Sequence, residues 1–324
     1  MSASPVGSPI LSVVMPLFNA ERHVAAAARS VLDSTLRDIE LLVVDDGSTD
    51  GSVVQIQTIN DPRLHLISLS PSGGPSRPRN TGITRARAPY VALLDADDLL
   101  KPHKLGDAVE ALATHPEAGI AFADYERIDA DGRVLSESVL TEYPVFRSLP
   151  SRSLRDGWHQ IPQVHFIRGL LHENFIGTSG VVLRRSVLEE VGMFDETLTY
   201  SEDRDLWFRI AHAYDALYQA RIGHSYRVSA TSLTFRPGER QARQRIETLR
   251  RERRRWSSRA EKRQVDRLIA ENFNALGYER RRVGRRVAGA AAFLQAIRHS
   301  AQLRFLRAAI GSLVLGPRAA NSQR

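Results

Sequence analysis

Short apolar runs alternate with stretches of helical apolar spacing through the first 115 residues. The runs predict strands at residues 10–17, 39–44, 64–69 and 90–94, and the helical spacing predicts helices at residues 21–34, 52–59, 81–87 and 103–114. Runs this apolar are typical of parallel strands that are covered on both faces. Strands and helices in alternation, joined by right-handed crossovers, predict an α/β fold with a doubly wound, mostly parallel sheet.

The pattern is weaker in the second third of the chain. We expect a short strand at residues 119–123, an irregular segment at residues 136–168 that covers a site, and a strand at residues 178–184. Helices are expected at residues 186–191, where Gly192 ends the helix, and at residues 202–213. Beyond residue 235 the pattern is helical and rich in arginine.

These patterns predict three segments. Residues 1–9 are small and polar and are expected to be disordered, residues 10–235 to form an α/β domain, and residues 236–324 to form a basic helical C-terminal region. The net charge is +8, but residues 235–324 contain 23 Lys and Arg against 7 Asp and Glu, a balance of +16, so the preceding residues carry −8. An acidic body with a basic tail indicates that the tail meets an anionic partner.

Other properties of the composition exclude some classes of protein. The chain has no cysteine, which excludes disulfides, thiolate metal sites and cysteine nucleophiles. It has no apolar run of about 18 residues, so we expect no membrane span. The first residues lack the charged and apolar parts of a signal peptide, which agrees with a cytoplasmic location.

Three carboxylates follow the apolar run at residues 90–94. Asp95, Asp97 and Asp98 lie where that strand ends, the edge of a parallel sheet at which ligands bind. Carboxylates this close repel one another, and a divalent cation shared with substrate phosphates would neutralise them. The alternative is a helix N-cap at Asp98, for which one aspartate would suffice.

Two other strands end in polar motifs that parallel pairing would bring to the same edge. Residues 16–21 (PLFNAE) end the first strand, and residues 45–50 (DDGSTD) end the second. Asp46 could accept a hydrogen bond from the imide N–H of a nucleotide base. The alternative for residues 45–48 is a plain turn.

A loop of small residues with two arginines joins this edge at residues 72–80 (SGGPSRPRN). Arg77 and Arg79 offer forked donors that suit phosphate, and beside the carboxylates they favour a diphosphate site. The alternative is a flexible surface loop with solvated arginines. The chain has no G-x-G-x-x-G, which disfavours a Rossmann dinucleotide site, and no G-x-x-x-x-G-K, which excludes a P-loop.

An acidic helix start is predicted at residues 200–207 (YSEDRDLW). Ser201 is expected to cap this helix, and the first-turn carboxylates of Glu202 and Asp203 suit the positive end of the helix dipole. Asp205 is expected to pair with Arg209 four residues later. A catalytic role for these carboxylates requires that they face the same cleft as Asp95, which the sequence leaves open.

Six motifs in this order along the chain resemble glycosyltransferase family 2: PLFNAE, VVDDGSTDGS, GPSRPRNTGI, YVALLDADD, GTSGVVLRRSVLEEVGMFDE and SEDRDLWFRIA. The chain is similar to the family over about residues 10–235. The resemblance implies a GT-A fold with a nucleotide-binding half at about residues 10–115 and an acceptor half at about residues 116–235. It also implies inverting transfer of a sugar from a nucleotide-sugar donor to an acceptor hydroxyl, with Mn²⁺ or Mg²⁺ as cofactor.

The resemblance also implies roles for particular residues. Those implied for donor nucleotide binding are Pro16, Phe18, Glu21, Asp46, Arg77, Arg79 and Asp95. Pro16 and Phe18 would line the nucleoside pocket, and Asp46 would bind the base. Arg79, with Arg77 as helper, would meet the base or the diphosphate.

A metal site and a catalytic base are implied in the same way. Asp97 would be the direct metal ligand, with Asp95 as second metal residue nearer the ribose. Asp203 would be the general base that takes the proton of the acceptor hydroxyl on the face opposite the leaving diphosphate, and Glu202 is the alternate. The HSYR segment at residues 224–227 departs from the family's frequent Tyr-Arg-x-His arrangement, because Ser229 stands where His often does.

The acceptor implied by the family is a glycan or a lipid-linked saccharide. The candidates for contacting it are Trp158, His159, His172, Thr178 and Ser179. Residues 293–315 mix apolar residues with arginine, so the tail could lie peripherally on an anionic membrane surface at its cytoplasmic face. The alternatives are a helical subdomain with solvated arginines and, less favoured because no recognition motif is present, a nucleic-acid-binding region.

Two other functions stay open on the sequence. Nucleotidyl transfer also uses strand-end carboxylates and a metal, but it would not need Asp203. A degenerate sugar-nucleotide-binding or scaffold protein is the other, and the presence of Asp46, Asp97 and Asp203 counts against it. The chain is also compatible with an oligomer.

Overall fold

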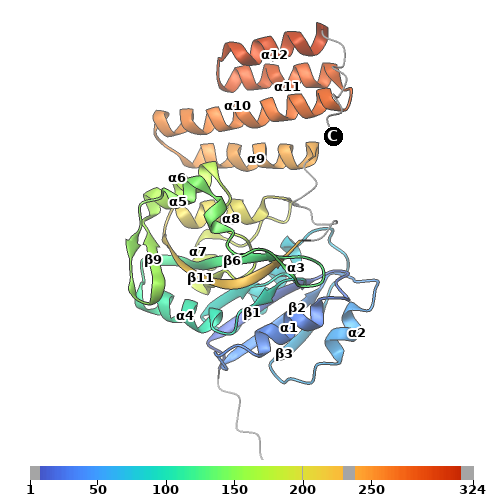
Figure 1. Cartoon of the computed structure of the whole chain (residues 1–324), viewed down its shortest axis with the longest axis vertical. Coiled ribbons are helices and arrows are strands. Elements are labelled where there is room, and N and C mark those ends of the chain that lie inside the picture. The colour runs from blue at the N-terminus through green and yellow to red at the C-terminus, as the bar shows by residue number, and fades with distance from the viewer. Residues whose placement is uncertain (1–7, 199, 229–237, 315–324) are drawn as a thin grey trace, which may run out of the picture. The chain divides into compact units, whose positions relative to one another are not determined.

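The computed structural model describes residues 8–198, 200–228 and 238–314 (Figure 1). The chain divides into two compact units, Met1–Ala230 and Thr231–Arg324. The domain boundary expected at residue 235, the position of Ser229 and most of the N-terminal segment expected to be disordered lie outside the described residues.

Four parallel strands form the first half of the sheet. They are β1 (Leu11–Leu17), β2 (Ile39–Asp45), β3 (Leu64–Ser68) and β4 (Tyr90–Leu93), in the order β3-β2-β1-β4. In the register between β1 and β2, Leu17 lies opposite Asp45. The motifs that follow β1, β2 and β4 therefore meet at one edge of the sheet, as predicted.

Helices cover both faces of these strands, because successive side chains of a strand point to opposite faces. The helices are α1 (Val24–Leu32), α2 (Ser52–Gln57), α3 (Ser76–Arg85) and α4 (Lys104–Thr114). Leu11, Val13 and Met15 share one core cluster with the apolar residues of α1 and α4. On the other face Gly82 of α3 approaches β1 so closely that a Cβ atom there would lie 2.4 Å from Val14. The doubly wound α/β class is confirmed.

The second half of the sheet is mixed. Its long strands are β6 (Ala118–Ile128) and β11 (Asp215–Arg227), which are parallel to each other, and β10 (Val182–Arg184) lies antiparallel between β4 and β6. The other strands are β5 (Leu99–Leu100), β7 (Val134–Ser136), β8 (Arg152–Ser153) and β9 (Trp158–Ile161). β9 extends the sheet beyond β11, and β8 extends it beyond β9.

The structure corrects several sequence expectations here. Residues 136–168, expected to be irregular, contain β8, β9, the short helices η1 (Leu140–Glu142), α5 (Pro144–Arg147) and η2 (Arg155–Gly157), and the start of α6 (Gln163–His172). They fold because aromatic side chains far apart in sequence gather there, with the Phe146 ring 4.9 Å from that of Phe175 and 5.0 Å from that of Tyr218. β6 is longer than the strand expected at residues 119–123, and β11 was not predicted at all.

The start of α3 is a further correction. The sequence placed residues 76–79 in a loop, but α3 begins at Ser76 and carries Arg77 and Arg79 on its first turn. Pro78 is compatible with this position because the N–H groups of a first helical turn have no partner within the helix. The remaining helices of this unit are α7 (Arg185–Val191), which ends at Gly192 with φ of 84° as predicted, and α8 (Glu202–Ala211).

The second unit is helical, as expected from its pattern. It contains α9 (Glu239–Arg255), α10 (Arg259–Arg282), α11 (Arg286–His299) and α12 (Leu303–Val314). These helices stack in chain order, each against the next (Figure 1). Phe293 and Phe305 are fully buried in this unit, and the Ser258 side chain accepts hydrogen bonds from the first backbone N–H groups of α10. The unit therefore has its own apolar core.

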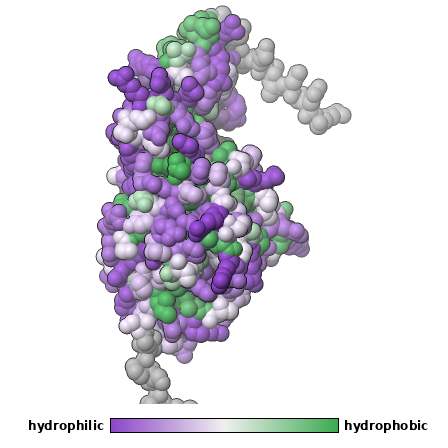
Figure 2. Space-filling view, turned by 90° about the vertical axis from the view of Figure 1, so that its left-hand side faces the viewer, coloured by the Kyte–Doolittle hydropathy of each residue, from purple (hydrophilic) through white to green (hydrophobic). Residues whose placement is uncertain are grey.

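The last described helix has apolar residues on two faces. Phe305, Ala308 and Ala309 are buried. Exposed apolar residues recur on the other side of α12, with exposed fractions between 44% and 72%: Leu303, Leu306, Ile310 and Leu313. Figure 2 shows hydrophobic residues gathered over α12 of the helical unit, at the top of the view. Within the described ranges, none of the helices has the length and apolar character needed to cross a membrane.

Candidate active site

The motifs that follow β1 and β2 hold each other through hydrogen bonds. The side chain of Asn19, which has a positive φ of 49°, accepts from the Thr49 N–H at 2.8 Å, and the Asn19 N–H donates to the Ser48 hydroxyl at 3.0 Å. Glu21 accepts from the Gly51 N–H at 3.2 Å. Pro16 is half-buried, and Phe18 is 58% exposed. The exposed ring leaves an apolar surface beside this network.

Asp46 lies at the same edge and is almost fully buried. Its carboxylate accepts from the Ser72 N–H at 3.0 Å and from the Ser72 hydroxyl at 2.8 Å. Ser72 and the exposed Arg77 line a cavity of about 310 Å³ that also reaches Glu196. The expected loop therefore closes onto Asp46, and Arg77 faces an open space next to it.

The three carboxylates after β4 have different surroundings. Asp98 is fully buried, and it accepts from the Ser179 hydroxyl at 2.5 Å and from the Arg227 N–H at 2.7 Å. The Arg227 guanidinium donates to the Asp97 carbonyl at 2.9 Å. Asp98 therefore joins the end of β4 to β11 and to the turn before β10. The helix N-cap alternative does not hold, because β5 follows Asp98.

Burial changes the proton affinity of this cluster. Burial and the nearby charge of Asp95 raise the pKa of Asp97 to about 6. Burial, followed by the charges of Asp97 and Asp95, raises the pKa of Asp98 well above its usual value. A divalent cation would relieve this repulsion, so the donor set of Asp95 and Asp97 fits a hard cation that completes its coordination with phosphate and water. Among the described residues no group of three or more His, Cys, Asp and Glu could hold a metal by itself.

Arg79 links the two halves of this unit. Its guanidinium donates to Asp95 at 2.7 Å and to Glu202 at 2.9 Å, and it lies 5.3 Å from the centre of the Phe194 ring. Arg79 is 3% exposed. Burial alone would lower its pKa, but the charges of Asp95 and Glu202 raise it. The two ion pairs bring the start of α8 next to the end of β4, which the sequence could not determine.

The two neighbouring carboxylates at the start of α8 are not equivalent. Glu202 is 8% exposed and is held by Arg79, and burial together with the Asp203 charge raises its pKa. Asp203 is half-buried and accepts from the Asn174 amide at 3.0 Å and from the Arg204 N–H at 2.6 Å. The side-chain amide oxygen of Asn174 is buried without a hydrogen-bond partner in the described part of the chain. Asp203 is therefore oriented and has an open side, whereas Glu202 is already engaged.

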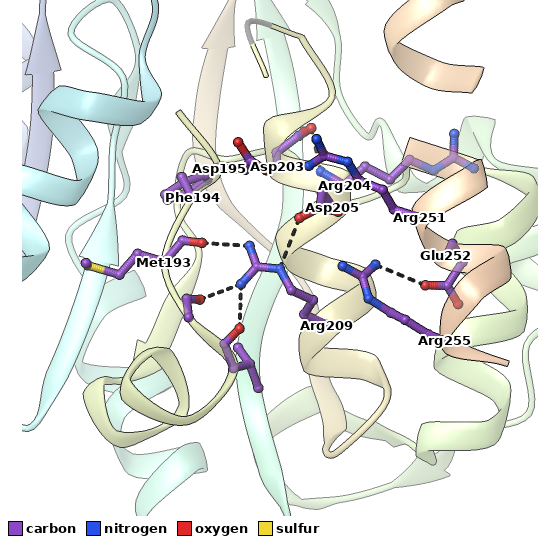
Figure 3. A network of polar contacts seen from close by, with 12 residues as sticks. Met193, Phe194, Asp195, Asp203, Arg204, Asp205, Arg209, Arg251, Glu252 and Arg255 are labelled. Carbon is purple, nitrogen blue, oxygen red and sulfur yellow. Dashed lines mark hydrogen bonds and ion pairs between the residues drawn. The ribbon is translucent and has the colours of Figure 1, made fainter. Parts of the chain in front are cut away.

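Arg209 fixes α8 against the turn that follows α7. Figure 3 shows Arg209 facing the turn after α7, where it donates to the carbonyls of Val191, Gly192 and Met193 at 2.6–2.7 Å. Arg209 also pairs with Asp205 at 3.0 Å, as predicted. Ser201 precedes the helix with a positive φ of 60°, and its side chain makes no capping hydrogen bond, so the predicted cap is wrong.

The acceptor candidates are dispersed. Trp158 is 5% exposed and belongs to the core, with the Lys104 ammonium 5.5 Å from its ring, so it is not on a surface that an acceptor could reach. His159 stacks on Tyr218 at 4.7 Å, and His172 is exposed at the end of α6. Thr178 is half-buried, and Ser179 is buried between Asp98 and the Asp95 N–H.

Sequence reasoning missed the roles of Asn174 and Arg227 in this site. Their contacts span 29 residues to Asp203 and 129 residues to Asp98. A polar residue between two apolar stretches (LLHENFIG) was the available signal for Asn174, and Arg227 lay inside a motif that was interpreted only through its missing histidine.

The mixed, mostly parallel sheet with flanking helices, in which β10 lies antiparallel beside β4, has the architecture of GT-A glycosyltransferases. The glycosyl transferase family 2 model matches residues 12–192, and the chain belongs to this family. An uncharacterized glycosyltransferase of Rickettsia bellii is 29% identical over 203 residues, which are 62% of this chain and 27% of that protein. The chain spans between about a quarter and a half of the length of the first curated relatives that it matches.

Solved structures share the fold. S. aureus TarS in complex with UDP-GlcNAc superposes with a TM-score of 0.64 at 19% identity, covering 91% of this chain and 82% of that one. The mannosyltransferase PcManGT from Pyrobaculum calidifontis, in complex with GDP-Man and Mn²⁺, gives a TM-score of 0.60 at 18% identity, covering 97% of this chain and 83% of that one. The predicted GT-A fold is thereby confirmed.

Proposed function

We propose that the protein is an inverting glycosyltransferase that moves a sugar from a nucleoside-diphosphate sugar to an acceptor hydroxyl. The observation that carries the proposal is the double ion pair of Arg79, which joins Asp95 on the donor side to Glu202 beside Asp203. A donor-side carboxylate pair and a candidate base then lie at one site. Membership of glycosyl transferase family 2 supports the same reaction class.

In this proposal Asp203 is the general base. A hydroxyl attacks poorly until a carboxylate within hydrogen-bonding reach takes its proton as the new bond forms. The Asn174 amide occupies one carboxylate oxygen of Asp203 and orients the group toward the acceptor. Attack from the side of α8, opposite the leaving diphosphate, gives inversion at the anomeric carbon without a covalent intermediate. Glu202 is less suited because Arg79 already holds its carboxylate.

The donor would lie along the edge formed by the ends of β1, β2 and β4. Phe18 and Pro16 offer the apolar surface for the nucleoside. The Asp46 carboxylate, which Ser72 holds in this structure, would accept from the base once the loop that carries Ser72 opens. The exposed guanidinium of Arg77 suits the diphosphate, whereas Arg79 acts by positioning Asp95 and Glu202. Asp97, with Asp95, would hold Mn²⁺ or Mg²⁺, which neutralises charge on the departing diphosphate when it is bound. PcManGT shares the fold and binds GDP-Man together with Mn²⁺, which supports this arrangement.

The acceptor would lie on the side of α8 and the segment before β10. His159, His172 and Thr178 are the candidates that remain accessible. The side-chain amide oxygen of Asn174, which has no hydrogen-bond partner among the described residues, could accept from an acceptor hydroxyl. The +16 charge of residues 235–324 and the exposed apolar stripe of α12 support a lipid-linked acceptor at an anionic membrane surface.

The test compares Asp203→Asn with Glu202→Gln. UDP-GlcNAc and GDP-mannose are offered with Mn²⁺, and released nucleoside diphosphate is measured, while thermal shifts with UDP, GDP, dTDP and CMP report donor binding. Loss of a general base should lower turnover by about 10²–10⁴-fold, so we expect Asp203→Asn to lose that much with its thermal shift kept and Glu202→Gln to lose less. A larger loss in Glu202→Gln would move the base to Glu202, and release of sugar 1-phosphate in place of nucleoside diphosphate would indicate nucleotidyl transfer instead.

A further inference from the structure

The helical unit contains a pocket of about 410 Å³ between α9, α10 and α11. Arg243, Ile246 and Arg250 of α9 line it, as do Phe273, Leu276 and Arg280 of α10. On each helix these residues are three and four positions apart, so each helix presents one continuous face to the pocket. The volume lies in the range of small-molecule binding sites, which is roughly 300–1,000 Å³.

The pocket is apolar inside and cationic at its rim. Ile246, Phe273 and Leu276 are at most 9% exposed and form an apolar floor. Arg243 and Arg280 each donate to Glu239 at 2.6 Å, so one carboxylate serves two guanidinium groups.

Two guanidinium groups at the pocket have donors without a carboxylate or hydrogen-bond partner in the part of the chain that the structure describes. Arg250 has no ion pair with a carboxylate among the residues that the structure describes, and its guanidinium lies 5.3 Å from the centre of the Phe273 ring. The Nε atom of Arg280 is buried and has no hydrogen-bond partner in the same part of the chain. The ring holds Arg250 at the pocket, where its forked donors are available to an anion.

We propose that this pocket binds the phosphate headgroup of an anionic lipid, with the lipid chain on the apolar floor. Guanidinium groups bind phosphate through two parallel hydrogen bonds, and the three arginines supply more positive charge than Glu239 removes. A lipid chain would pack against Phe273 and Leu276, a contact that free phosphate cannot make. Single-stranded nucleic acid needs a row of exposed rings for stacking, but the one ring of this pocket is already covered by Arg250.

Lipid binding at this pocket does not depend on the proposed transfer reaction. A basic surface attracts any anionic membrane through its total charge. A lipid pocket differs because it requires particular arginines and a particular apolar wall, and it accepts a single lipid molecule in solution.

The test uses the full chain and dihexanoyl phosphatidylglycerol below its micelle concentration, with isothermal titration calorimetry as the measurement. Arg250→Gln is compared with Arg245→Gln, which removes the same charge from an exposed position of α9 outside the pocket. We expect binding to weaken roughly tenfold or more in Arg250→Gln and by less than roughly twofold in Arg245→Gln.

A second pair of variants changes shape without changing charge. Ala291 is an exposed pocket-lining residue of α11, and Ala291→Phe should fill the pocket and abolish lipid binding. Leu294→Phe enlarges an exposed side chain of the same helix outside the pocket and should leave binding unchanged. Equal losses in Arg250→Gln and Arg245→Gln would overturn the proposal, as would full binding by Ala291→Phe. Inorganic phosphate that binds as tightly as the lipid, or a single-stranded RNA that binds more tightly and is lost in Arg250→Gln, would overturn it too.

Discussion

The two units of this chain differ in the sign of the charge that gathers at their sites. In the α/β unit, Asp95, Asp97 and Asp98 are crowded at the end of β4, where burial and mutual repulsion raise the pKa of Asp97 to about 6. In the helical unit arginines are in excess, and hydrogen bonds from Arg280 and Arg243 lower the pKa of Glu239 to about 2. One unit therefore has surplus negative charge inside a site, and the other has surplus positive charge around a pocket.

The charged groups of the two units also differ in burial, and therefore in how much their ion pairs contribute to stability. Arg79 is buried, so its charge must be met by partners inside the fold. Glu239 and Arg243 are at least partly solvated, so water shares in their compensation. Breaking contacts should therefore cost stability in the first unit, whereas in the second it should mainly change what the surface binds.

The largest effect is expected for Arg79→Met. Removing this guanidinium leaves the Asp95 and Glu202 carboxylates without their cation, and breaking a buried pair in this way costs about 3–5 kcal/mol. Urea unfolding followed by tryptophan fluorescence measures the loss. Adding Glu202→Gln should restore part of the stability, because one of the two unpaired charges is then removed. A loss below about 1 kcal/mol would mean that burial does not distinguish the two units.

A smaller effect of opposite sign is expected for Lys104→Met. Lys104 is fully buried, its ammonium has no hydrogen-bond partner among the described residues, and burial lowers its pKa from 10.5 to about 7, with Asp107 opposing the shift. Its charge also contributes to the lowered pKa values of His224, which is buried, and of His103. Methionine keeps the packing over Trp158 without the charge, so we expect stability at pH 7 to rise by about 1–3 kcal/mol.

The pH dependence of the wild type checks the same residue. Between pH 7 and 10.5 the unfolded state binds the Lys104 proton and the folded state does not, so this group makes stability rise with pH across that window. Lys104→Met should flatten the rise. Urea unfolding at several pH values would contradict the assignment if both proteins showed the same slope.

The smallest effect is expected for Glu239→Gln. This carboxylate pairs with Arg243, Arg280 and, at 3.4 Å, Arg285, but its side chain is 27% exposed. We expect a change in stability below about 1 kcal/mol. Without the competing carboxylate, dihexanoyl phosphatidylglycerol should bind roughly twofold to fivefold more tightly. Weaker lipid binding in this variant would show that Glu239 holds the arginines in place rather than competing with the anion.

The parallel half of the sheet was predictable and the mixed half was not. β1 to β4 are apolar runs separated by helices of matching period, so local pattern and tertiary environment agree. Buried and exposed side chains alternate irregularly along β11, because the strand is buried on part of each face and its register against β6 shifts. Its sequence, with polar Gln219, His224 and Ser225 buried in the fold, gives no clear period.

Local patterns along the chain predicted the strand-end carboxylates, the acidic start of α8 and the division between an acidic body and a basic helical tail. Apolar period and charge are local properties, and they can be read along the chain. The same patterns could not show that Arg79 neutralises Asp95 and Glu202, that Asp98 joins strands, or that Asn174 contacts Asp203. These contacts join residues that lie 16 to 129 positions apart in the sequence. Which buried charge finds which partner depends on how the sheet is folded, because a desolvated charge is stabilised only by groups that the fold brings within hydrogen-bonding distance.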